Sequence, residues 1–424
     1  MIQLSKLAVA AILAVAPVAL ASPAQDLFDQ GSFFLQFDYF GYSTVSVKDL
    51  TDKYQAQLDT ACATQKDTCP YTVAADILTK MTADLKDGHT YYLTPDEYAQ
   101  ETGQIRGGSN PSPGPRIGVT TQRIPGSPDR RVITVLPGSP AEKAGLQRGD
   151  RIVGVNGAPL PDSDQDNASA ITKLVATGKP LTVNIKRNQD NVENALTLNL
   201  TLTGQVVDLA NVSTLTKLNA TTGLLKIPEF SGGTGEKVNE LVVSAQKQGL
   251  TSLIVDLRDD PGGVECQQAV YPFVGDLTRE RADRRGVTYD IVRNGATYQR
   301  DASGREVQVD ALDTVARWTG KLAVLVNGES GSCSELFASD VQYAKSGVIV
   351  GEPTYGVGNT GTELVPLIDG SALAITSRRT LRANGTPYPD KVTPDIQLPG
   401  GADEFLKTGF DRELERALQE VSAA

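Results

Sequence analysis

The sequence predicts a multidomain α/β protein with a helical N-terminal region, a β-rich middle domain and an α/β core. Three observations support this prediction. Apolar residues recur at helical spacing before residue 106, short strands with tight turns follow between residues 116 and 205, and strands alternate with helices from residue 206 onward. At 424 residues, the chain is long enough for each region to bury a core of its own.

The first 21 residues, MIQLSKLAVAAILAVAPVALA, contain one lysine and an apolar run that ends in Ala19-Leu20-Ala21. This pattern is typical of a Sec-type signal peptide cleaved after Ala21, which predicts an exported protein in the periplasm, the cell envelope or the medium. The alternative is an uncleaved membrane anchor, although the apolar run is short for crossing a bilayer. No later run is long enough to span a membrane, so we expect a mature chain that is soluble or peripherally associated with a membrane.

Residues 22–106 form the predicted N-terminal helical region. Two stretches in it, VSVKDLTDKYQAQLDTA and AADILTKMTADLKDG, carry apolar residues at three- and four-residue spacing. In an oxidising compartment, Cys62 and Cys69 are close enough in the chain to form a disulfide across a short loop. Residues 107–115, rich in Gly, Pro and Ser, are predicted to be a linker.

Residues 116–205 contain the segment RRVITVLPGSPAEKAGLQRGDRIVGVNGAPL. Ser139 and Pro140 are expected to start a short helix, Gly145 to end it, and Asn156-Gly157 to join two strands. This stretch resembles a PDZ domain. The resemblance implies that peptides add as an extra strand beside a loop that binds their terminal carboxylate. The positions expected to bind peptide are Arg116, Ile117, Gly118 and Val119 in the loop, and Ile171, Leu174 and Val175 on a helix, where apolar residues can equally belong to the core.

Residues 206–400 form the predicted α/β core, and residues 401–424 a C-terminal helix. TGLLKIPEF and LTSLIVDLRDDPGG are predicted strands, with an amphipathic helix, GTGEKVNELVVSAQKQG, between them. Cys266 and Cys333 lie in segments assigned to this core, where we expect free, buried thiols.

The phrases DLRDDPGG, NGESGSCSEL and VGEPTYGVG occur in this order after the PDZ-like segment. Together with DGHTYYLTP before that segment and VTPDIQLP near the end, they resemble the carboxyl-terminal processing (tail-specific) proteases of serine peptidase family S41. The resemblance covers nearly the whole mature chain. It implies an S41-type protease core that hydrolyses peptide bonds and captures protein or peptide substrates by their exposed C-termini.

Ser332 is the expected nucleophile. A catalytic serine needs an exposed place at a strand-to-helix turn, small neighbours and N–H donors for the oxyanion. Ser332 follows Gly331 and precedes a predicted helix, so the N–H of Cys333 is expected to be an oxyanion donor. The resemblance places the second donor in the turn at Gly262 and Gly263. Ser330 and Ser334 are expected to serve in capping and packing.

One position departs from the family pattern. Processing proteases carry a lysine between the two glycines of the turn in VGEPTYGVG, where it acts as general base, and this chain has Val357. Valine cannot accept a proton. Lys345 and Lys391 do not fall in the motif.

His89, the only histidine, lies in KDGHT. Family members that resemble the tricorn core protease use the corresponding histidine in a serine-histidine-acid arrangement, and histidine suits a base at neutral pH. Their acid comes from the loop ahead of the PDI phrase, which offers Asp390 here, with Asp395 as an alternative. Glu335 is expected to be structural.

Two functions therefore follow from the sequence. The first is a serine endopeptidase with Ser332, His89 and Asp390 as its catalytic residues. The second is a catalytically inactive S41-fold protein that only binds peptides, and an unrecognised lysine or other base remains a third reading. The chain has 40 basic and 51 acidic residues, so it lacks the basic surface that nucleic-acid binding requires. With one histidine and no CxxC pair, neither zinc nor another cofactor is expected.

Overall fold

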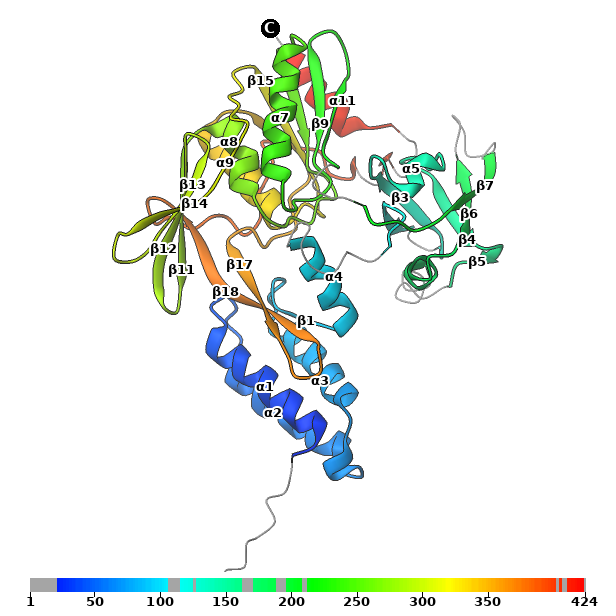
Figure 1. The fold of residues 1–424 in the computed structure, drawn as a ribbon, viewed down its shortest axis with the longest axis vertical. Coiled ribbons are helices and arrows are strands. Elements are labelled where there is room, and N and C mark those ends of the chain that lie inside the picture. Colours follow the sequence, from blue (N-terminus) through cyan, green and yellow to red (C-terminus); the bar gives the residue numbers. More distant parts are fainter. Residues whose placement is uncertain are drawn as a thin grey trace, which may run out of the picture.

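The computed structural model describes residues 21–105, 115–124, 127–161, 171–187, 196–207, 212–401, 404–405 and 410–422. Residues 1–20 of the predicted signal peptide and 107–114 of the predicted linker lie outside the described residues. Figure 1 shows a helical N-terminal region below an α/β core, with a separate β-rich unit beside that core. The predicted mixed α/β architecture with several sheets is confirmed.

The N-terminal region is built from helices whose ends follow from local chemistry. Ser22 Oγ accepts a hydrogen bond from Gln25 N, and Ser46 Oγ accepts one from Asp49 N, so a serine caps each of the first two helices. The disulfide between Cys62 and Cys69 is present, as predicted. The elements are α1 (Pro23–Asp38), α2 (Val47–Cys62), the 3₁₀ turn η1 (Lys66–Thr68), α3 (Tyr71–Asp84), β1 (Tyr91–Leu93) and α4 (Pro95–Ile105).

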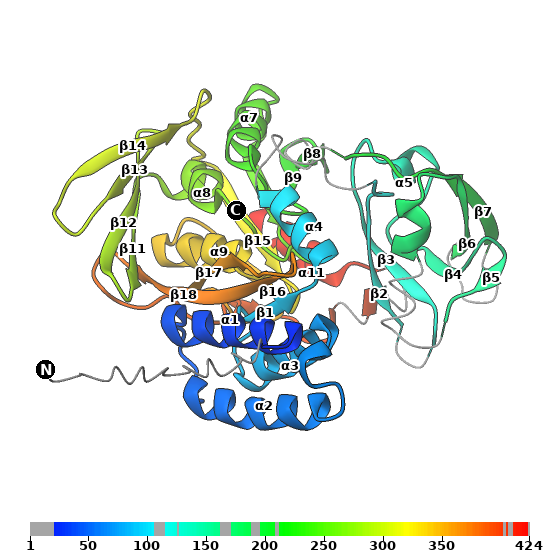
Figure 2. The ribbon, with the colours of Figure 1, turned by 60° about the horizontal axis from the view of Figure 1, so that its bottom comes forward.

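An antiparallel seven-stranded sheet connects this region with the rest of the protein. Its order is β1-β18-β11-β12-β13-β14, with β17 also paired with β18. Leu367, Leu373 and Ile375, from the β17–β18 hairpin, share a buried core with α1, α2 and α3. Figure 2 shows β17 and β18 between these helices and the α/β core. The strands are β11 (Leu277–Asp283), β12 (Gly286–Arg293), β13 (Ala296–Arg300), β14 (Glu306–Ala311), β17 (Thr360–Pro366) and β18 (Ala372–Arg382).

The β-rich unit has the short capped helix that the sequence predicts. Ser139 caps α5 (Pro140–Lys143) by accepting a hydrogen bond from Glu142 N, and Asn156 and Gly157 both have positive φ angles in a tight turn. The sheet order is β2-β3-β4-β6-β7, with β5 paired with β4, so β2 lies at an edge. The strands are β2 (Val119–Arg123), β3 (Arg130–Val135), β4 (Arg151–Val155), β5 (Ala158–Pro159), β6 (Leu181–Arg187) and β7 (Leu196–Leu202).

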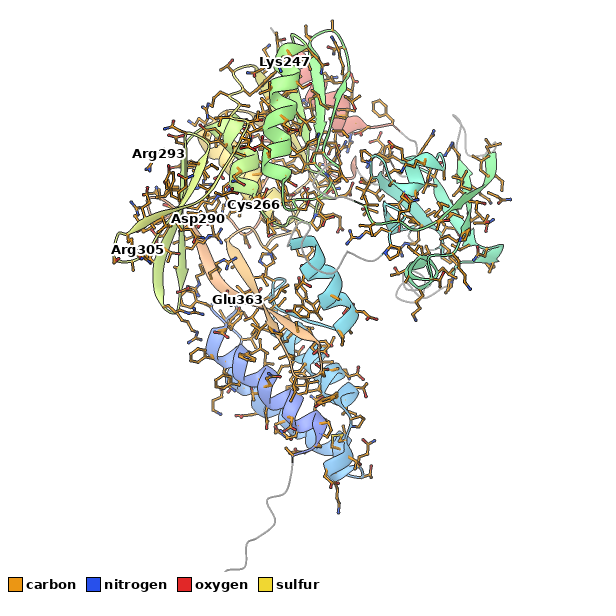
Figure 3. The ribbon with its side chains drawn as sticks, in the orientation of Figure 1. Lys247, Cys266, Asp290, Arg293, Arg305 and Glu363 are labelled. Atoms are coloured by element: carbon orange, nitrogen blue, oxygen red, sulfur yellow. A yellow bond between two sulfur atoms is a disulfide. The ribbon has the colours of Figure 1, made fainter. Side chains whose placement is uncertain are left out.

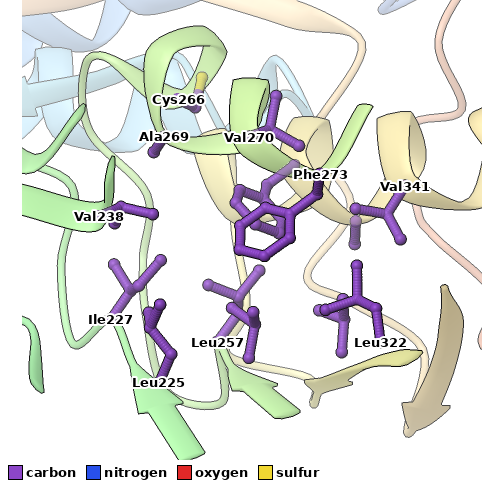
Figure 4. Close-up of a cluster of buried hydrophobic side chains, with 14 of the residues drawn as sticks. Leu225, Ile227, Val238, Leu257, Cys266, Ala269, Val270, Phe273, Leu322 and Val341 are labelled. Atoms are coloured by element: carbon purple, nitrogen blue, oxygen red, sulfur yellow. The ribbon is translucent and has the colours of Figure 1, made fainter. Parts of the chain in front are cut away.

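The α/β core is a six-stranded sheet in the order β19-β16-β15-β10-β9-β8, parallel except for the β8–β9 pair. Side chains alternate along β10: Leu253 and Val255 pack against α7, α8 and α9, while Ile254 packs against α11. Figure 4 shows part of the first cluster, including Phe273 and Val341. The elements are β8 (Thr214–Lys217), β9 (Thr222–Lys226), α7 (Thr234–Lys247), β10 (Ser252–Asp256), α8 (Cys266–Val274), β15 (Lys321–Val326), α9 (Cys333–Ala344), β16 (Val348–Gly351), β19 (Ile396–Gln397) and α11 (Arg412–Ser422).

The sequence predicted that Cys266 and Cys333 are free, buried thiols. In the structure they form a second disulfide. The prediction was wrong because 67 residues separate the two cysteines in the chain. They begin α8 and α9, which follow the neighbouring parallel strands β10 and β15. Strand pairing therefore brings together the starts of two helices that sequence spacing does not relate.

Candidate active site

Ser332 lies at the carboxyl end of β15, directly before α9, where open α/β sheets place their functional loops. Its φ angle of 49° is in a region that residues other than glycine rarely adopt. Holding such a conformation costs about 1–3 kcal/mol, which the surrounding contacts must offset, and conformations of this kind concentrate at functional sites. The turn therefore has the geometry that the sequence predicts for a nucleophile.

The Gly262-Gly263 turn packs against this serine. A Cβ added at Gly262 would lie 2.7 Å from Ser332 Cβ and 2.8 Å from Cys333 N, and one added at Gly263 would lie 1.8 Å from Phe230 O. With φ angles of 105° and 131°, both positions require glycine. The turn is consequently able to approach the serine loop more closely than any other residue type would permit.

Two of the three predicted oxyanion donors are available. The N–H groups of Gly263 and Cys333 have no hydrogen-bond acceptor among the described residues. Gly262 does not fit its predicted role, because its N–H donates to Asp260 Oδ1 at 2.9 Å. The usable pair is therefore Gly263 and Cys333, one from each side of the serine.

Asp260 is a support for this site that sequence reasoning missed. Its backbone oxygen accepts hydrogen bonds from Gly331 N and Ser334 Oγ, both at 3.0 Å, so it ties the glycine turn to the serine loop. Burial raises the pKa of its carboxyl well above the usual range. Ser334, like Ser330, whose hydroxyl donates to Leu257 O, has the packing role that the sequence predicts.

Glu335 joins Ser332 to the turn at residues 354–358. Its carboxylate accepts hydrogen bonds from the N–H groups of Ser332 (2.9 Å), Gly356 (2.7 Å) and Val357 (2.9 Å). Burial raises the pKa of Glu335, and these donors oppose that rise. The expected structural role is present, and the S-x-x-E spacing of Ser332 and Glu335 is a capping-box signal that indicates it.

Val357 occupies the position where the family pattern has its lysine. Its side chain is buried and faces the KDGHT loop: a Cβ added at Gly88 would lie 3.1 Å from Val357 Cγ1. The apolar side chain thus fills space beside His89. Val357 contributes packing and no proton acceptor to the site.

His89 is held by Thr360, a residue that no sequence signal indicated. Nδ1 lies 2.8 Å from Thr360 Oγ1, and the Thr360 hydroxyl can donate to Val357 O at 3.3 Å. Because a carbonyl oxygen only accepts, this arrangement makes Thr360 Oγ1 the acceptor of an Nδ1–H bond. The imidazole then carries its proton on Nδ1, and Nε2 is free to accept one.

Among the described residues, no hydrogen bond joins His89 to Asp390, its predicted partner. Asp390 is exposed, and its carboxylate accepts from Lys391 N instead of from the imidazole. Asp395, the alternative, accepts from Ile349 N and Gln342 Nε2 and so fixes the final strand of the sheet. The acid near His89 is Asp87, which accepts a hydrogen bond from the His89 backbone N–H at 3.0 Å.

The surroundings of His89 favour its neutral form. Burial, with a smaller contribution from the positive charge of Arg378, lowers the pKa of His89 to about 4 against the opposing effect of Asp87. Among the described residues, no hydrogen bond joins His89 to Ser332. Both flank the same turn, because Tyr355 contacts positions next to each of them, at Gly88 and Gly331.

Neither Lys345 nor Lys391 is in a position that suits a general base for Ser332. Lys345 lies at the C-terminal end of α9, about 18 Å of helix away from Ser332. Lys391 crosses the turn near Val357, since a Cβ added at Gly356 would lie 3.1 Å from Lys391 Cε. Lys391 is exposed, whereas a lysine base is usually neutralised by burial.

In the β-rich unit, the loop predicted to bind a carboxylate presents free donors. The backbone N–H groups of Ile117 and Gly118 have no acceptor among the described residues. Arg116 pairs through its backbone with Gln205, and Val119 begins the edge strand β2. On the opposite helical segment, Ile171 and Leu174 are partly exposed, but Val175 is buried in the core and is not available to a peptide.

Comparison with known proteins assigns both domains. Residues 131–187 match the PDZ domain family, and residues 221–398 match Peptidase family S41. The chain therefore combines a PDZ domain with a peptidase domain. The S41 match covers residues 221–398, and the curated relatives to which the chain is similar include carboxyl-terminal-processing proteases.

The similarity to individual proteins is moderate. A carboxyl-terminal-processing protease of Synechocystis sp. is 26% identical over 304 residues, which is 70% of this chain and 64% of the relative. The chloroplastic C-terminal processing peptidase of Tetradesmus obliquus is 28% identical over 344 residues, covering 76% of this chain and 67% of the relative. A solved photosystem II D1 C-terminal processing protease shares the fold, with a TM-score of 0.52, 24% identity and coverage of 92% of this chain and 98% of that chain.

Proposed function

We propose that the protein is an exported serine endopeptidase that recognises C-terminal tails through its PDZ domain and hydrolyses peptide bonds with Ser332. The observation that carries this proposal is the Ser332 turn, in which a serine with positive φ lies between the unpaired N–H groups of Gly263 and Cys333. Such donors, placed where charge develops, are the usual means of stabilising a tetrahedral intermediate.

In the proposed mechanism, His89 Nε2 takes the proton of Ser332 Oγ as that oxygen attacks the carbonyl carbon of the substrate. The carbonyl oxygen becomes negative and accepts hydrogen bonds from Gly263 and Cys333. The imidazolium then donates the proton to the leaving amine, and an acyl-enzyme forms. Water, activated by the same nitrogen, releases the acid product. Thr360 has the orienting role that the sequence assigned to Asp390.

Substrate capture is proposed to use the edge of the PDZ sheet. Among the described residues, strand β2 has one unpaired side, and the N–H groups of Ile117 and Gly118 are free to donate hydrogen bonds to a terminal carboxylate. Ile171 and Leu174 are suitable for contacts with apolar side chains of the bound tail. The domain would thereby select unfolded or exposed C-termini.

Export is supported by the cysteines as well as by the leader sequence. All four cysteines form disulfides, at Cys62–Cys69 and Cys266–Cys333. Structural disulfides of this kind persist in oxidising compartments. Among the described residues, no helix is long and apolar enough to cross a membrane.

A second candidate function is that of an inactive, peptide-binding S41 protein. Val357 favours it, because the family's lysine base has been replaced by a buried apolar side chain. In that case, the PDZ domain alone would carry the function. The Ser332 turn would then be a remnant without chemistry.

A fluorophosphonate probe separates the two candidates, because it labels an activated serine and not an inert one. We expect labelling of the full chain, cleavage of an unfolded model protein, and loss of both in Ser332→Ala. Lys391→Met is the companion variant for a lysine-based mechanism, and we expect it to retain both activities. An unlabelled, inert wild-type protein that still binds peptides would establish the second candidate.

A further inference from the structure

A polar groove of 710 Å³ lies between the start of α8 and the β11–β14 strands. One of its walls begins at Glu265, two residues after the Gly262-Gly263 turn. Another wall includes Arg378 of β18, the residue whose charge acts on His89. The groove therefore borders the segment that follows the Gly262-Gly263 turn, and one of its lining side chains, Arg378, is near enough for its charge to act on His89.

Almost every charged side chain that lines this groove already has a partner. Glu265 accepts from two backbone N–H groups, and Asp283 from two more. Figure 3 labels Asp290 and Arg305 on these strands: Asp290 pairs with Arg281, and Arg305 pairs with Asp301. The remaining partnered groups are Asp310, bonded to Gln268, and Arg300, stacked over the Tyr289 ring.

Arg378 is the exception among the described charged groups of the groove. The Arg378 side chain makes no hydrogen bond or ion pair with another described residue, and its Nε is buried without a partner. The side chain lies over Gly361, where a Cβ would be 2.4 Å from Nε, so the backbone leaves room for it. Its pKa falls to about 10 because it is buried and repelled by Arg281.

An unpaired, partly buried guanidinium is costly unless a ligand neutralises it. The group that fits it best is a carboxylate, which accepts two parallel hydrogen bonds from arginine. The acids whose charges act on Arg378 are Asp290, Glu363 and Asp283, and among the described residues none of them forms an ion pair with it. Asp290 is bound to Arg281, and Asp283 to a backbone turn. A carboxylate from outside the folded chain can therefore supply the direct partner that these acids do not.

We propose that Arg378 forms an anion subsite of the groove, and that it binds a carboxylate of the peptide substrate near the scissile bond. The subsite gives the protein a preference for substrates with an acidic side chain at one position. This inference rests on the proposed function for its substrate class, although the binding itself does not require catalysis. Glutamate and aspartate side chains are the ligands assigned, and the terminal carboxylate is the other source of the same chemistry.

The test measures binding to the full chain with Ser332→Ala, so that no peptide is cleaved. Fluorescein-labelled peptides carry one glutamate in an otherwise neutral extended sequence, and partner peptides carry glutamine at that position. We expect the glutamate peptide to bind about tenfold more tightly at one position, as a charge-assisted pair predicts. Arg378→Gln should abolish the difference, and Arg378→Lys should keep part of it.

Arg305→Gln is the matched control, since it removes an arginine from the same groove that already has a partner, and it should leave the preference in place. Amidated peptides identify the source: a preference that depends on Arg378 and survives amidation belongs to the side chain. A loss of that preference on amidation would assign the terminal carboxylate instead and overturn the side-chain assignment. Equal binding of glutamate and glutamine peptides, or a preference that persists in Arg378→Gln, would overturn the subsite altogether. Because these are binding measurements, they are independent of whether the wild-type protein cleaves.

Discussion

The Cys266–Cys333 disulfide joins the two elements that frame the candidate nucleophile. It links the first residue of α8, three positions past Gly263, to the residue after Ser332, and the two Cα atoms lie 5.3 Å apart. We expect that replacing both cysteines with alanine destabilises the α/β core. The same change should make the positions of the Gly263 and Cys333 N–H groups less fixed relative to each other.

The size of the effect follows from the length of the closed loop. A disulfide restricts the unfolded chain, and the chain-entropy relation gives about 4 kcal/mol for a separation of 67 residues. The same relation gives about 2 kcal/mol for the separation of 7 residues between Cys62 and Cys69. The double variant at Cys266 and Cys333 should therefore lose roughly twice as much stability as the one at Cys62 and Cys69.

Urea unfolding monitored by tryptophan fluorescence measures this difference. Trp318 is the only tryptophan and is buried in the α/β core cluster, so its emission reports on that domain. The midpoint should fall clearly in the Cys266→Ala/Cys333→Ala protein, while Cys62→Ala/Cys69→Ala should leave the Trp318 transition nearly in place. A core as stable without the Cys266–Cys333 bond as with it would refute the reasoning.

Activity provides a second readout of the same variant. Removing one oxyanion donor typically lowers kcat by about a hundredfold or more, and loosening the pair should cost less, about tenfold. Tail binding by the PDZ domain should change little, because the bond lies outside that domain. An unchanged kcat in a folded variant would show that the disulfide stabilises the core without positioning the donors.

The other predictions concern the general base and the binding of peptide C-termini by the PDZ domain. His89→Ala should reduce cleavage by orders of magnitude, and because burial lowers the pKa of His89 to about 4, the rate should rise with pH through about 4 and then stay level; an acid limb near ~6.5 would argue against a buried base. Thr360→Val should lower kcat more than Asp390→Asn, since Thr360 bonds Nδ1 and Asp390 does not; the reverse order would restore the original assignment. Val357→Lys should not be needed for activity, and an inert wild type that becomes active only with this change would falsify the histidine mechanism. Fluorescence anisotropy should show that amidating a peptide's C-terminus removes most PDZ binding, whereas equal binding of the two forms would contradict carboxylate capture.

Local sequence was sufficient for features that depend on neighbours in the chain. Ser139 and Pro140 start a short helix, Asn156-Gly157 forms a tight turn, and Cys62 pairs with Cys69, because each needs only a few consecutive residues in the right conformation. The Ser332 turn belongs to the same class. Its small residues and its place after an apolar strand predicted the geometry that the structure has.

Local sequence patterns did not predict the contacts between segments that are distant in the chain. Thr360 holds His89 across 271 positions of sequence, because β18 pairs with β1 along one edge and with β17 along the other. The sequence predicted Asp390, an acid in the expected loop, as the partner of His89. In the fold, Asp390 is exposed.

The second disulfide and the unpaired Arg378 have the same origin. Cys266 meets Cys333 because parallel pairing of β10 and β15 aligns the starts of two helices. Arg378 has no ion pair among the described residues, because Asp290 pairs with Arg281 of the neighbouring strand and Asp283 bonds to its own turn. The sequence by itself predicted the mixed α/β architecture with its PDZ domain, the turn at Ser332 and the valine at the position of the family's lysine. Only the tertiary structure decided which groups meet, because partners distant in sequence depend on how the strands pair.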